Sequence, residues 1–157
     1  MKQELKKELE DAFAKTKKEF GLTKTFEEYE NIFFLYDMAV QDGFVAESFH
    51  RQLSSRIVNI FNSWYNHLHS IILPSQGSMV SMTESNMFED KEKEALTILM
   101  NKIIEHIAKN TIVTLTKDVE EQRAFLDDSV DFWNEIKPPL LGMAKQVHAG
   151  WNKYTKE

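Results

Sequence analysis

Residues that form turns are scarce in this sequence: Gly occurs five times and Pro three times in 157 residues. A chain with so few turn formers has few turns, which favours long helices over many short strands. Its length fits one domain spanning residues 1–157, and 42% hydrophobic with 28% charged residues is typical of a globular protein. The sequence therefore predicts an all-α fold, most simply an up-and-down bundle of five to six helices.

Apolar residues recur with helical periodicity along most of the chain. The N-terminal segment 1–20 is highly charged with a narrow apolar stripe, so we expect a peripheral helix there, with Gly21 as its C-cap. Thr25 and Glu28 form a T-x-x-E capping box, which predicts the start of a second helix. The predicted helices cover residues 3–20, 26–41, 46–73, 87–109, 117–136 and 140–154.

Three places in the sequence predict interruptions of these helices. Pro74 ends the third helix, and the Ser- and Met-rich stretch 74–86 is predicted to be a flexible loop. The β-branched run 110–116 favours a bend rather than a strand, because an isolated strand would have no partner. The Pro138-Pro139 dipeptide is predicted to end the fifth helix.

Composition narrows the possible functions. The chain has no Cys, which excludes disulfides, thiol nucleophiles and Cys-ligated zinc or iron–sulfur centres. A net charge of −6 and only three Arg make nucleic acid an unfavourable partner. The N-terminus has no apolar leader core, and no unbroken apolar stretch approaches the roughly 18 residues of a membrane span. We therefore expect a cytoplasmic protein without a transmembrane segment.

The stretch from Ser48 to Thr83 is the unusual part of the sequence, because its 36 residues contain no Asp, Glu or Lys. The overall composition predicts about six acidic residues in a stretch of this length. Its helical part is strongly amphipathic, and one side carries Asn, Ser, Gln and His where surface helices usually carry Lys and Glu. Asn and Ser are poor helix formers, so we expect this face to be covered by groups that satisfy its hydrogen bonds.

Four kinds of cover are compatible with the sequence. The bundle itself could provide it, which would make the third helix long and central, with an internal polar network. A protein partner or a second copy of the chain could provide it, because interfaces accept uncharged polar and aromatic groups. A small ligand could occupy a polar pocket around Arg56 and His67, with Arg56 as the anchor for an anion. A lipid or granule surface is the fourth kind, although helices on lipid usually carry Lys or Arg.

Methionines after the long helix favour a protein partner. Met79 and Met82 lie among Ser and Gly, and exposed Met side chains adapt to varied partners, although packing of these methionines onto the core is the simpler interpretation. We interpret the chain as a non-enzymatic interaction or regulatory protein, with a small-ligand-binding or hydrolytic protein as the alternative. The candidate binding residues are Gln52, Arg56, Asn59, Ser63, Asn66, His67, Ser70, Met79 and Met82.

One acidic motif invites comparison with metal sites. Asp127, Asp131 and Glu135 are four residues apart, so they line one helical face, and clustered carboxylates can hold Mg²⁺. No second acidic cluster of this kind accompanies them, so a solvated acidic face is the simpler interpretation. No catalytic residue and no cofactor is predicted, because the sequence contains no dinucleotide-binding, P-loop or nucleophile-elbow motif.

Overall fold

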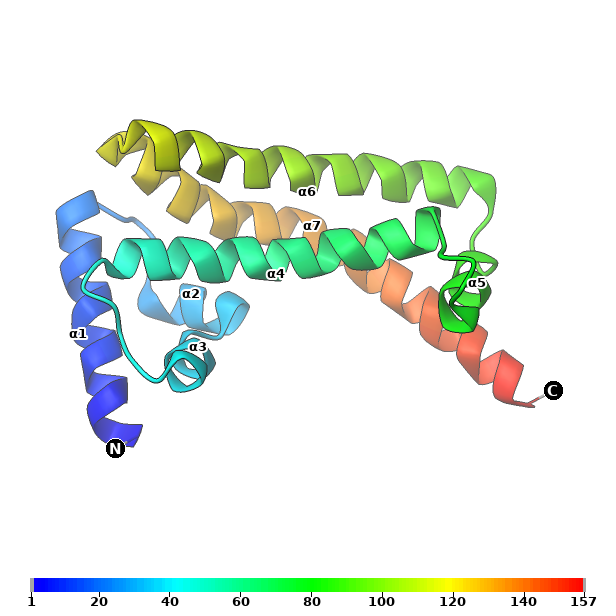
Figure 1. Cartoon of the computed structure of the whole chain (residues 1–157), viewed down its shortest axis with the longest axis horizontal. Helices are drawn as coiled ribbons and strands as arrows, with labels where there is room; N and C mark the ends of the chain where they lie inside the picture. The colour runs from blue at the N-terminus through cyan, green and yellow to red at the C-terminus, as the bar shows by residue number, and fades with distance from the viewer. Residues whose placement is uncertain (1, 157) are drawn as a thin grey trace. The chain divides into compact units, whose positions relative to one another are not determined.

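The computed structural model describes residues 2–156, and every regular element in that range is a helix. The predicted all-α class is confirmed. The predicted number of helices is wrong, because seven occur over residues 2–156: one predicted helix is divided, one predicted loop contains a helix, and two predicted helices are joined. The helices in Figure 1 are α1 (Lys2–Phe20), α2 (Phe26–Phe33), α3 (Leu35–Asp42), α4 (Phe49–Ile72), α5 (Met79–Ser85), α6 (Asp90–Thr116) and α7 (Val119–Lys156).

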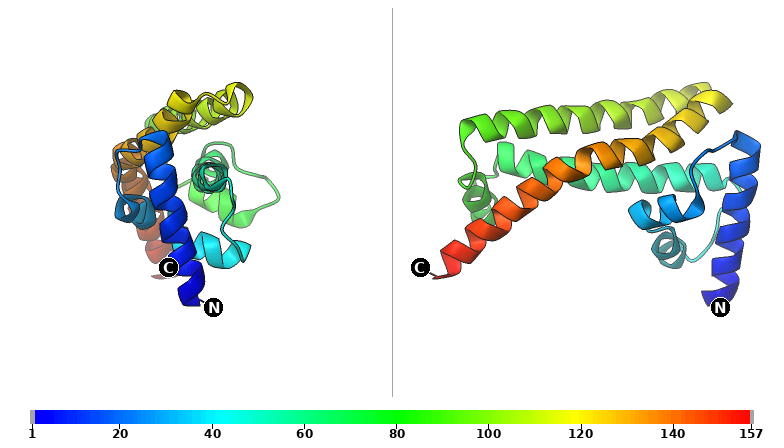
Figure 2. Two further views of the ribbon diagram at one scale, coloured as in Figure 1. Left: turned by 90° about the vertical axis from the view of Figure 1, so that its left-hand side faces the viewer. Right: turned by 180° about the vertical axis from the view of Figure 1, so that it is seen from behind.

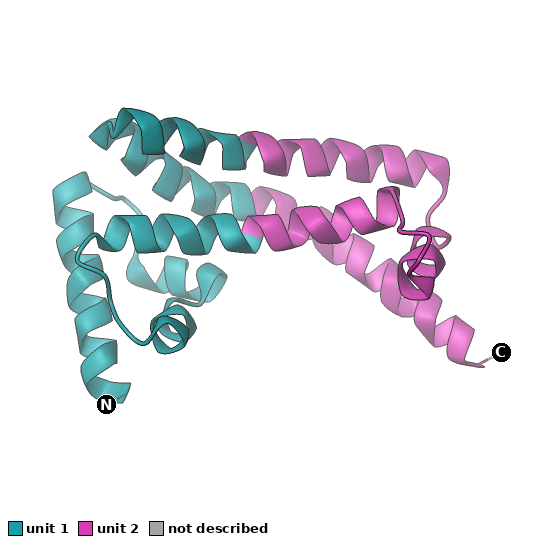
Figure 3. Ribbon diagram, in the orientation of Figure 1, with its two compact units in different colours: residues 1–60, 106–133 teal, residues 61–105, 134–157 magenta. Residues whose placement is uncertain are grey.

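Two compact units share these helices. Unit 1 comprises Met1–Ile60 and His106–Trp133, and unit 2 comprises Phe61–Glu105 and Asn134–Glu157 (Figure 3). Helices α4, α6 and α7 each contribute one part to unit 1 and another part to unit 2. Each unit buries its own set of apolar side chains.

Aromatic side chains are prominent in the core of unit 1. The ring of Phe13 in α1 meets the ring of Tyr29 in α2 edge-on, with centroids 5.4 Å apart, and that of Phe49 in α4 at 6.5 Å. Edge-to-face pairs of this kind add to the stabilisation that burial of the rings provides. The predicted capping box of Thr25 and Glu28 is confirmed, and it begins α2.

A break at Phe34 divides the predicted second helix, residues 26–41, into α2 and α3. Phe34 has a φ of +54°, a left-handed backbone that is strained for a residue with a large side chain. The guanidinium group of Arg56 donates to the carbonyl of Phe33 at 2.7 Å and to that of Phe34 at 3.4 Å, which stabilises the break. Local periodicity could not show this break, because Arg56 lies 22 residues further along the chain.

Unit 2 contains α5 where the sequence predicted a flexible loop over residues 74–86. The hydroxyl of Ser78 accepts a hydrogen bond from the amide of Ser81 at 3.1 Å and so caps the start of this short helix. The loop prediction is therefore wrong for residues 79–85. The buried apolar side chains of unit 2 are Phe61, Leu68, Ile71, Phe88, Leu96, Leu99, Ile103, Ile136, Leu140 and Met143.

The β-branched run 110–116 does not bend the chain, because α6 continues through it. The hydroxyl of Thr114 donates to the carbonyl of Asn110 at 2.8 Å, so this Thr is accommodated within the helix. Val113 in the same run is buried, and packing of this kind outweighs the small helix penalty of β-branched residues. The predicted bend is wrong.

The Pro138-Pro139 dipeptide does not end a helix either, because α7 continues through both prolines as one unbroken ribbon (Figure 2). A proline inside a helix removes one backbone hydrogen bond and crowds the preceding turn. Ile136, Leu140 and Met143 are buried around the dipeptide at helical spacing. Helix propensity does not account for the burial of this apolar face, and that burial explains why the helix continues through the prolines.

The predicted third helix is present as α4, with 24 residues. Two other helices are longer, since α6 has 27 residues and α7 has 38. The prediction of one long central helix is therefore not matched, because three long helices run through both units. Within residues 2–156, no helix is both long and apolar enough to cross a bilayer.

Candidate functional site

The candidate binding residues divide between the two units. Gln52, Arg56 and Asn59 belong to unit 1, whereas the other six belong to unit 2. Arg56 and His67 are both on α4, but they belong to different units. Arg56 lines a groove of about 600 Å³ in unit 1 together with Gln52 and Asn59, and His67 lines a groove of about 540 Å³ in unit 2. Arg56 and His67 thus each line a hollow of their own unit.

In the groove of unit 1, the side chains of Arg56 and Gln52 bind to the protein itself. Arg56 donates to the carbonyls at the α2–α3 break. The amide nitrogen of Gln52 donates to the carboxylate of Asp42 at 2.9 Å and to the carbonyl of Phe44 at 3.1 Å, and its amide oxygen accepts from the backbone of Ala46 at 2.9 Å. These two side chains therefore stabilise the break and the loop before α4.

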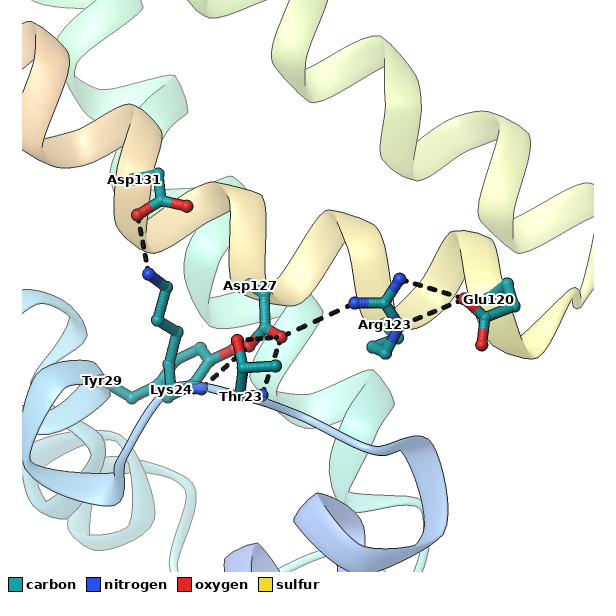
Figure 4. Close-up of polar contacts among 7 residues, drawn as sticks. All are labelled: Thr23, Lys24, Tyr29, Glu120, Arg123, Asp127 and Asp131. Atoms are coloured by element: carbon teal, nitrogen blue, oxygen red, sulfur yellow. Dashed lines mark hydrogen bonds and ion pairs between the residues drawn. The ribbon is translucent and has the colours of Figure 1, made fainter.

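The carboxylate of Asp127 is the centre of a hydrogen-bond network in unit 1 (Figure 4). Its Oδ2 accepts from the amide and hydroxyl of Thr23 at 2.9 and 3.0 Å, and its Oδ1 accepts from the hydroxyl of Tyr29 at 2.9 Å and the amide of Lys24 at 3.4 Å. The guanidinium group of Arg123 lies 4.0 Å away. Burial and the Asp127 charge raise the pKa of the Tyr29 hydroxyl, so this group stays a proton donor. Asp127 therefore ties the α1–α2 connection to α7.

The row of carboxylates on α7 does not gather into a metal site. Asp127 is buried, so the expectation of a solvated acidic face is wrong for this residue. Asp131 pairs with Lys24 at 2.8 Å, and Glu135 pairs with Lys102 at 3.4 Å. Among residues 2–156, no group of three or more His, Cys, Asp or Glu side chains could hold a metal ion.

A buried histidine in unit 1 was not identified from the sequence. The ring of His106 is stacked between Phe125 and Phe132, with centroids 5.1 and 4.5 Å away. Its Nε2 lies 2.8 Å from the hydroxyl oxygen of Ser129, and that hydroxyl donates to the carbonyl of Phe125 at 2.6 Å, so Nε2 is the donor. Burial and the charge of Lys109 lower the pKa of His106 to about 4. A neutral imidazole with 2% exposure is a core residue rather than a base in an active site.

In unit 2, α5 is oriented with its polar side inward and its apolar side outward. Ser81 and Ser85 are buried, with exposed fractions of 9% and 2%. Met79, Val80 and Met82 are exposed by 79%, 57% and 38%. This pattern is the reverse of the usual amphipathic helix on a globular protein. Leu73, which directly follows α4, is also exposed. We call Leu73, Met79, Val80 and Met82 the α5 surface.

Hydrogen bonds to the end of α4 fix this orientation of α5. The hydroxyl of Ser81 donates to the carbonyl of Ser70 at 2.8 Å and accepts from the amide of Ser75 at 3.3 Å. Ser70, a candidate binding residue, donates its own hydroxyl hydrogen to the carbonyl of His67 at 2.7 Å. Ser70 therefore acts inside the protein, where its carbonyl anchors α5.

A second set of contacts ties α5 and the residues after it to α7. The indole nitrogen of Trp151 donates to the carboxylate of Glu84 at 2.8 Å. The side-chain amide of Gln146 donates to the carbonyl of Met87 at 2.8 Å. The Met87 side chain lies against Gly150 so closely that a β-carbon at that position would collide with it. Because α5 is held at both sides, the outward direction of its apolar residues is a fixed feature of unit 2.

Next to these contacts, α4 and α7 form a groove in unit 2 that we call the tryptophan groove. The rings of Trp64 and His67 meet edge-on at 6.3 Å on its α4 side, and Trp151 lies on its α7 side. No Asp, Glu, Lys or Arg of residues 2–156 lines it, so the groove suits apolar side chains. Its lining residues are Ser63, Trp64, His67, Ala144, Val147, His148 and Trp151.

Some residues of this region were predicted from the sequence. Ser63, His67, Met79 and Met82 were candidates, and Asn66 is exposed on the same part of α4. Trp64 and Trp151 were missed because both fall on apolar stripes. The signal that could have found them is their residue type, since Trp is rarely fully buried and is enriched at interfaces. The chain matches no protein-family model, no curated protein and no solved structure.

Proposed function

We propose that this chain is a non-enzymatic interaction or regulatory protein that binds an apolar segment of another protein through unit 2. The contact would consist of the α5 surface and the tryptophan groove. The observation that carries the proposal is the orientation of α5, whose serines are buried while Met79, Val80 and Met82 face outward. In this proposal the chain is an up-and-down bundle that works in the cytoplasm without a cofactor.

The orientation of α5 supports a binding role on energetic grounds. Fully burying a Met or Val side chain contributes about 1.5–3 kcal/mol, so leaving three of them in water forgoes several kcal/mol of stabilisation. Four hydrogen bonds or caps, involving Ser78, Ser81 and Glu84, nevertheless hold the helix in this direction. Exposed apolar patches on soluble chains commonly mark the surfaces where partners bind.

The chemistry of the surface indicates what kind of partner fits. Met side chains are flexible and polarisable, so they adapt to apolar side chains of different shapes. The tryptophan groove, at about 540 Å³, offers two indole rings, and Trp is one of the residue types enriched at interface hot spots. Ser63 and Asn66 supply uncharged polar groups beside it. A partner segment with apolar side chains on one face, such as an amphipathic helix, meets these requirements.

Site-specific crosslinking tests the proposal, because the chain has no Cys. A Gln76→Cys variant carries a photo-crosslinker beside the α5 surface and is irradiated in a cell extract and as purified protein. We expect a defined adduct that disappears in the Val80→Glu background, because a carboxylate cannot be buried against an apolar partner. The matched control is Ile98→Glu, since Ile98 is 61% exposed in the same unit and Val80 is 57% exposed.

The two backgrounds decide the outcome. An adduct that is retained in the Ile98→Glu protein and lost in the Val80→Glu protein supports the proposal. An adduct that forms equally in both backgrounds, or in neither, would refute it. If purified protein alone gives an adduct of twice the chain mass, the partner is a second copy of the chain, and sedimentation velocity will show the same Val80-dependent dimer.

The two alternatives have less support. A small-ligand or hydrolytic pocket around Arg56 and His67 would require Arg56 to bind an anion, but its guanidinium group already donates to two carbonyls. A lipid or granule surface would contact α5, which has only seven residues and no Lys or Arg to attract anionic headgroups. Flotation with vesicles of anionic lipid would favour the lipid alternative if the chain bound and Val80→Glu released it.

A further inference from the structure

A hollow in unit 1 has the character of a ligand pocket, and the proposed function does not use it. It measures about 440 Å³, within the range of small-molecule sites. Residues from the end of α1, the first turns of α4, the end of α6 and the start of α7 line it. We call it the α4–α6 pocket, and the lining residues used below are Phe20, His50, Arg51, Ser54, Lys117 and Gln122.

The α4–α6 pocket is locally positive although the chain has a net charge of −6. Arg51 and Lys117 both line it, and Asp118 is the single carboxylate among the lining residues. One oxygen of Asp118 accepts the amide of Glu121 at 2.9 Å as the N-cap of α7. Two cations against one partly engaged carboxylate favour an anionic ligand.

Arg51 differs from the other two arginines. Arg56 donates to two backbone carbonyls, and Arg123 pairs with Glu120 at 3.0 Å. Within residues 2–156, the guanidinium group of Arg51 forms no hydrogen bond or ion pair, and its side chain is exposed beside the pocket. A planar guanidinium group with its donors available is well suited to bidentate contacts with phosphate.

Lys117 is placed at the pocket by an unusual backbone. It connects α6 to α7 with a φ of +55°, a left-handed conformation that Gly or Asn would adopt with less strain. A Lys in this position strains the backbone, whereas Gly would not. Strain of this kind is commonly found where a side chain is needed for binding.

The remaining walls supply polar and aromatic groups. Ser54 and Gln122 are buried, and the Gln122 amide donates to the Ser54 hydroxyl at 2.9 Å. On another wall, the rings of Phe20 and His50 lie 4.8 Å apart. Hydroxyl and amide groups can bind the oxygens of a phosphate or a sugar, and the ring wall gives an organic group an apolar surface.

We infer that the α4–α6 pocket binds a small phosphorylated organic molecule, with Arg51 and Lys117 on the phosphate and the Phe20–His50 wall beside the organic group. The cations supply charge-assisted hydrogen bonds, which are about twice as strong as neutral ones. The volume of about 440 Å³ is larger than inorganic phosphate needs, so the ligand is a phosphate monoester rather than the free anion.

His50 provides a readout inside the pocket. Burial lowers the pKa of its imidazole and the charge of Arg51 lowers it further, while Glu19 of α1 acts in the opposite direction. Lys117 and Asp118 are the charged groups that face the pocket from the α6–α7 connection. A bound phosphate dianion would favour the imidazolium form, so the pKa of His50 rises when the pocket is occupied.

The experiment follows the His50 ring resonances of the full chain by NMR during titration. The probes are AMP and glucose 6-phosphate, each compared with inorganic phosphate and with adenosine or glucose. We expect at least one ester to shift these resonances saturably and to raise the pKa of His50. Adenosine or glucose binding as tightly as its ester would overturn the role of the phosphate, and inorganic phosphate binding as tightly as the esters would overturn the assignment to an organic ester.

Two variants locate the contact. Arg51→Gln and Lys117→Gln are each expected to weaken ester binding about tenfold or more, the effect of losing one charge-assisted hydrogen bond. Lys7→Gln, which removes an exposed cation from α1 outside the pocket, is expected to leave the affinity unchanged. No response of His50 to either ester, or equal affinity in the Arg51→Gln and unmodified proteins, would overturn the inference.

Discussion

Unit 1 and unit 2 differ in how they use buried polar side chains. In unit 1 these side chains include a carboxylate, an imidazole and an amide, and several bind groups that are distant in sequence. In unit 2 the buried polar side chains are two serines, Ser81 and Ser85, both on α5. The buried polar residues of unit 1 are Thr16, Ser54, His106, Gln122, Asp127 and Ser129.

This difference shows that polar burial serves two ends in one chain. In unit 1 it specifies which elements pack together, because a buried carboxylate or imidazole is tolerated only with its own partners. In unit 2 it directs the apolar residues of α5 outward, because the serines take the inner positions. Buried polar residues therefore determine which elements pack together in unit 1, whereas in unit 2 they determine which residues of α5 are exposed.

The largest expected effect is the loss of the Asp127 network in unit 1. Asp127→Ala removes the acceptor of Thr23, Lys24 and Tyr29, so we expect the free energy of unfolding to fall by about 3 kcal/mol. Urea denaturation measures the change. Hydrogen exchange should show that the backbone amides of the α1–α2 connection are the first to exchange faster than in the unmodified protein.

The control for this prediction is the next residue. Asp128 is exposed, so Asp128→Ala should change the free energy of unfolding by no more than about 0.5 kcal/mol. Equal effects of the two substitutions would contradict the assignment of a specific role to Asp127.

A second effect in unit 1 depends on pH. The folded state holds His106 with a pKa of about 4, below the ordinary value of an exposed imidazole, so the unfolded state binds the proton more readily. The contribution of His106 to the free energy of unfolding is therefore constant above about pH 6.5. It falls as the pH decreases toward 4, by on the order of 3 kcal/mol in total. Urea denaturation at several pH values should show this slope.

Substitution isolates the contribution of this one histidine. The carboxylates of the chain also titrate at low pH, so the comparison is between the unmodified protein and His106→Gln. The difference between their unfolding free energies should change across pH 6.5 to 4. A constant difference would show that folding does not lower the pKa of His106.

In unit 2 we expect smaller effects and the opposite ranking of polar and apolar residues. Ser81→Ala removes the hydrogen bonds to Ser70 and Ser75 and should lower the free energy of unfolding by about 1 kcal/mol. Met79→Ala should change it by no more than about 0.5 kcal/mol, because Met79 is 79% exposed. Thermal denaturation of both variants measures the ranking, and a larger loss for Met79→Ala would show that α5 does not face outward.

The smallest expected effect compares two glycines of α7. A methyl group at Gly142 would meet no atom within 4 Å, so Gly142→Ala should raise the free energy of unfolding by about 0.5–1 kcal/mol through helix propensity. Gly150→Ala should show less gain or a loss, because its methyl group would collide with Met87. Equal gains in urea denaturation would show that Met87 does not pack on Gly150.

Local signals in the sequence predicted much of the helical structure. The capping box at Thr25 is confirmed, and Gly21 and Gly43 have the left-handed backbone expected after helices, with φ of +73° and +79°. The helical ranges of α1 and α4 agree with the prediction within a few residues. These features depend on neighbours in the sequence, which is why periodicity and cap residues were sufficient.

The errors arose where distant residues decide the local structure. The break at Phe34 depends on Arg56, and the helical structure of residues 79–85 depends on contacts with Ser70 and Trp151. Continuation of α7 through its prolines depends on burial of apolar residues on both sides. The same dependence on distant residues limits what the sequence can say about the candidate binding residues. An uncharged face can be recognised in a sequence, but whether Arg56 binds a ligand or a carbonyl depends on what the fold places beside it.

The exposure of the α5 surface also has a chemical consequence. The thioethers of Met79 and Met82 are open to solvent, whereas Met38 and Met143 are 3% exposed and shielded by the core. Peroxide converts an accessible thioether into a polar sulfoxide, which methionine sulfoxide reductases can reverse. Two oxygen atoms added at α5 would thus make its apolar surface polar and leave the interior unchanged, so the surface that we propose binds a partner is also open to oxidants.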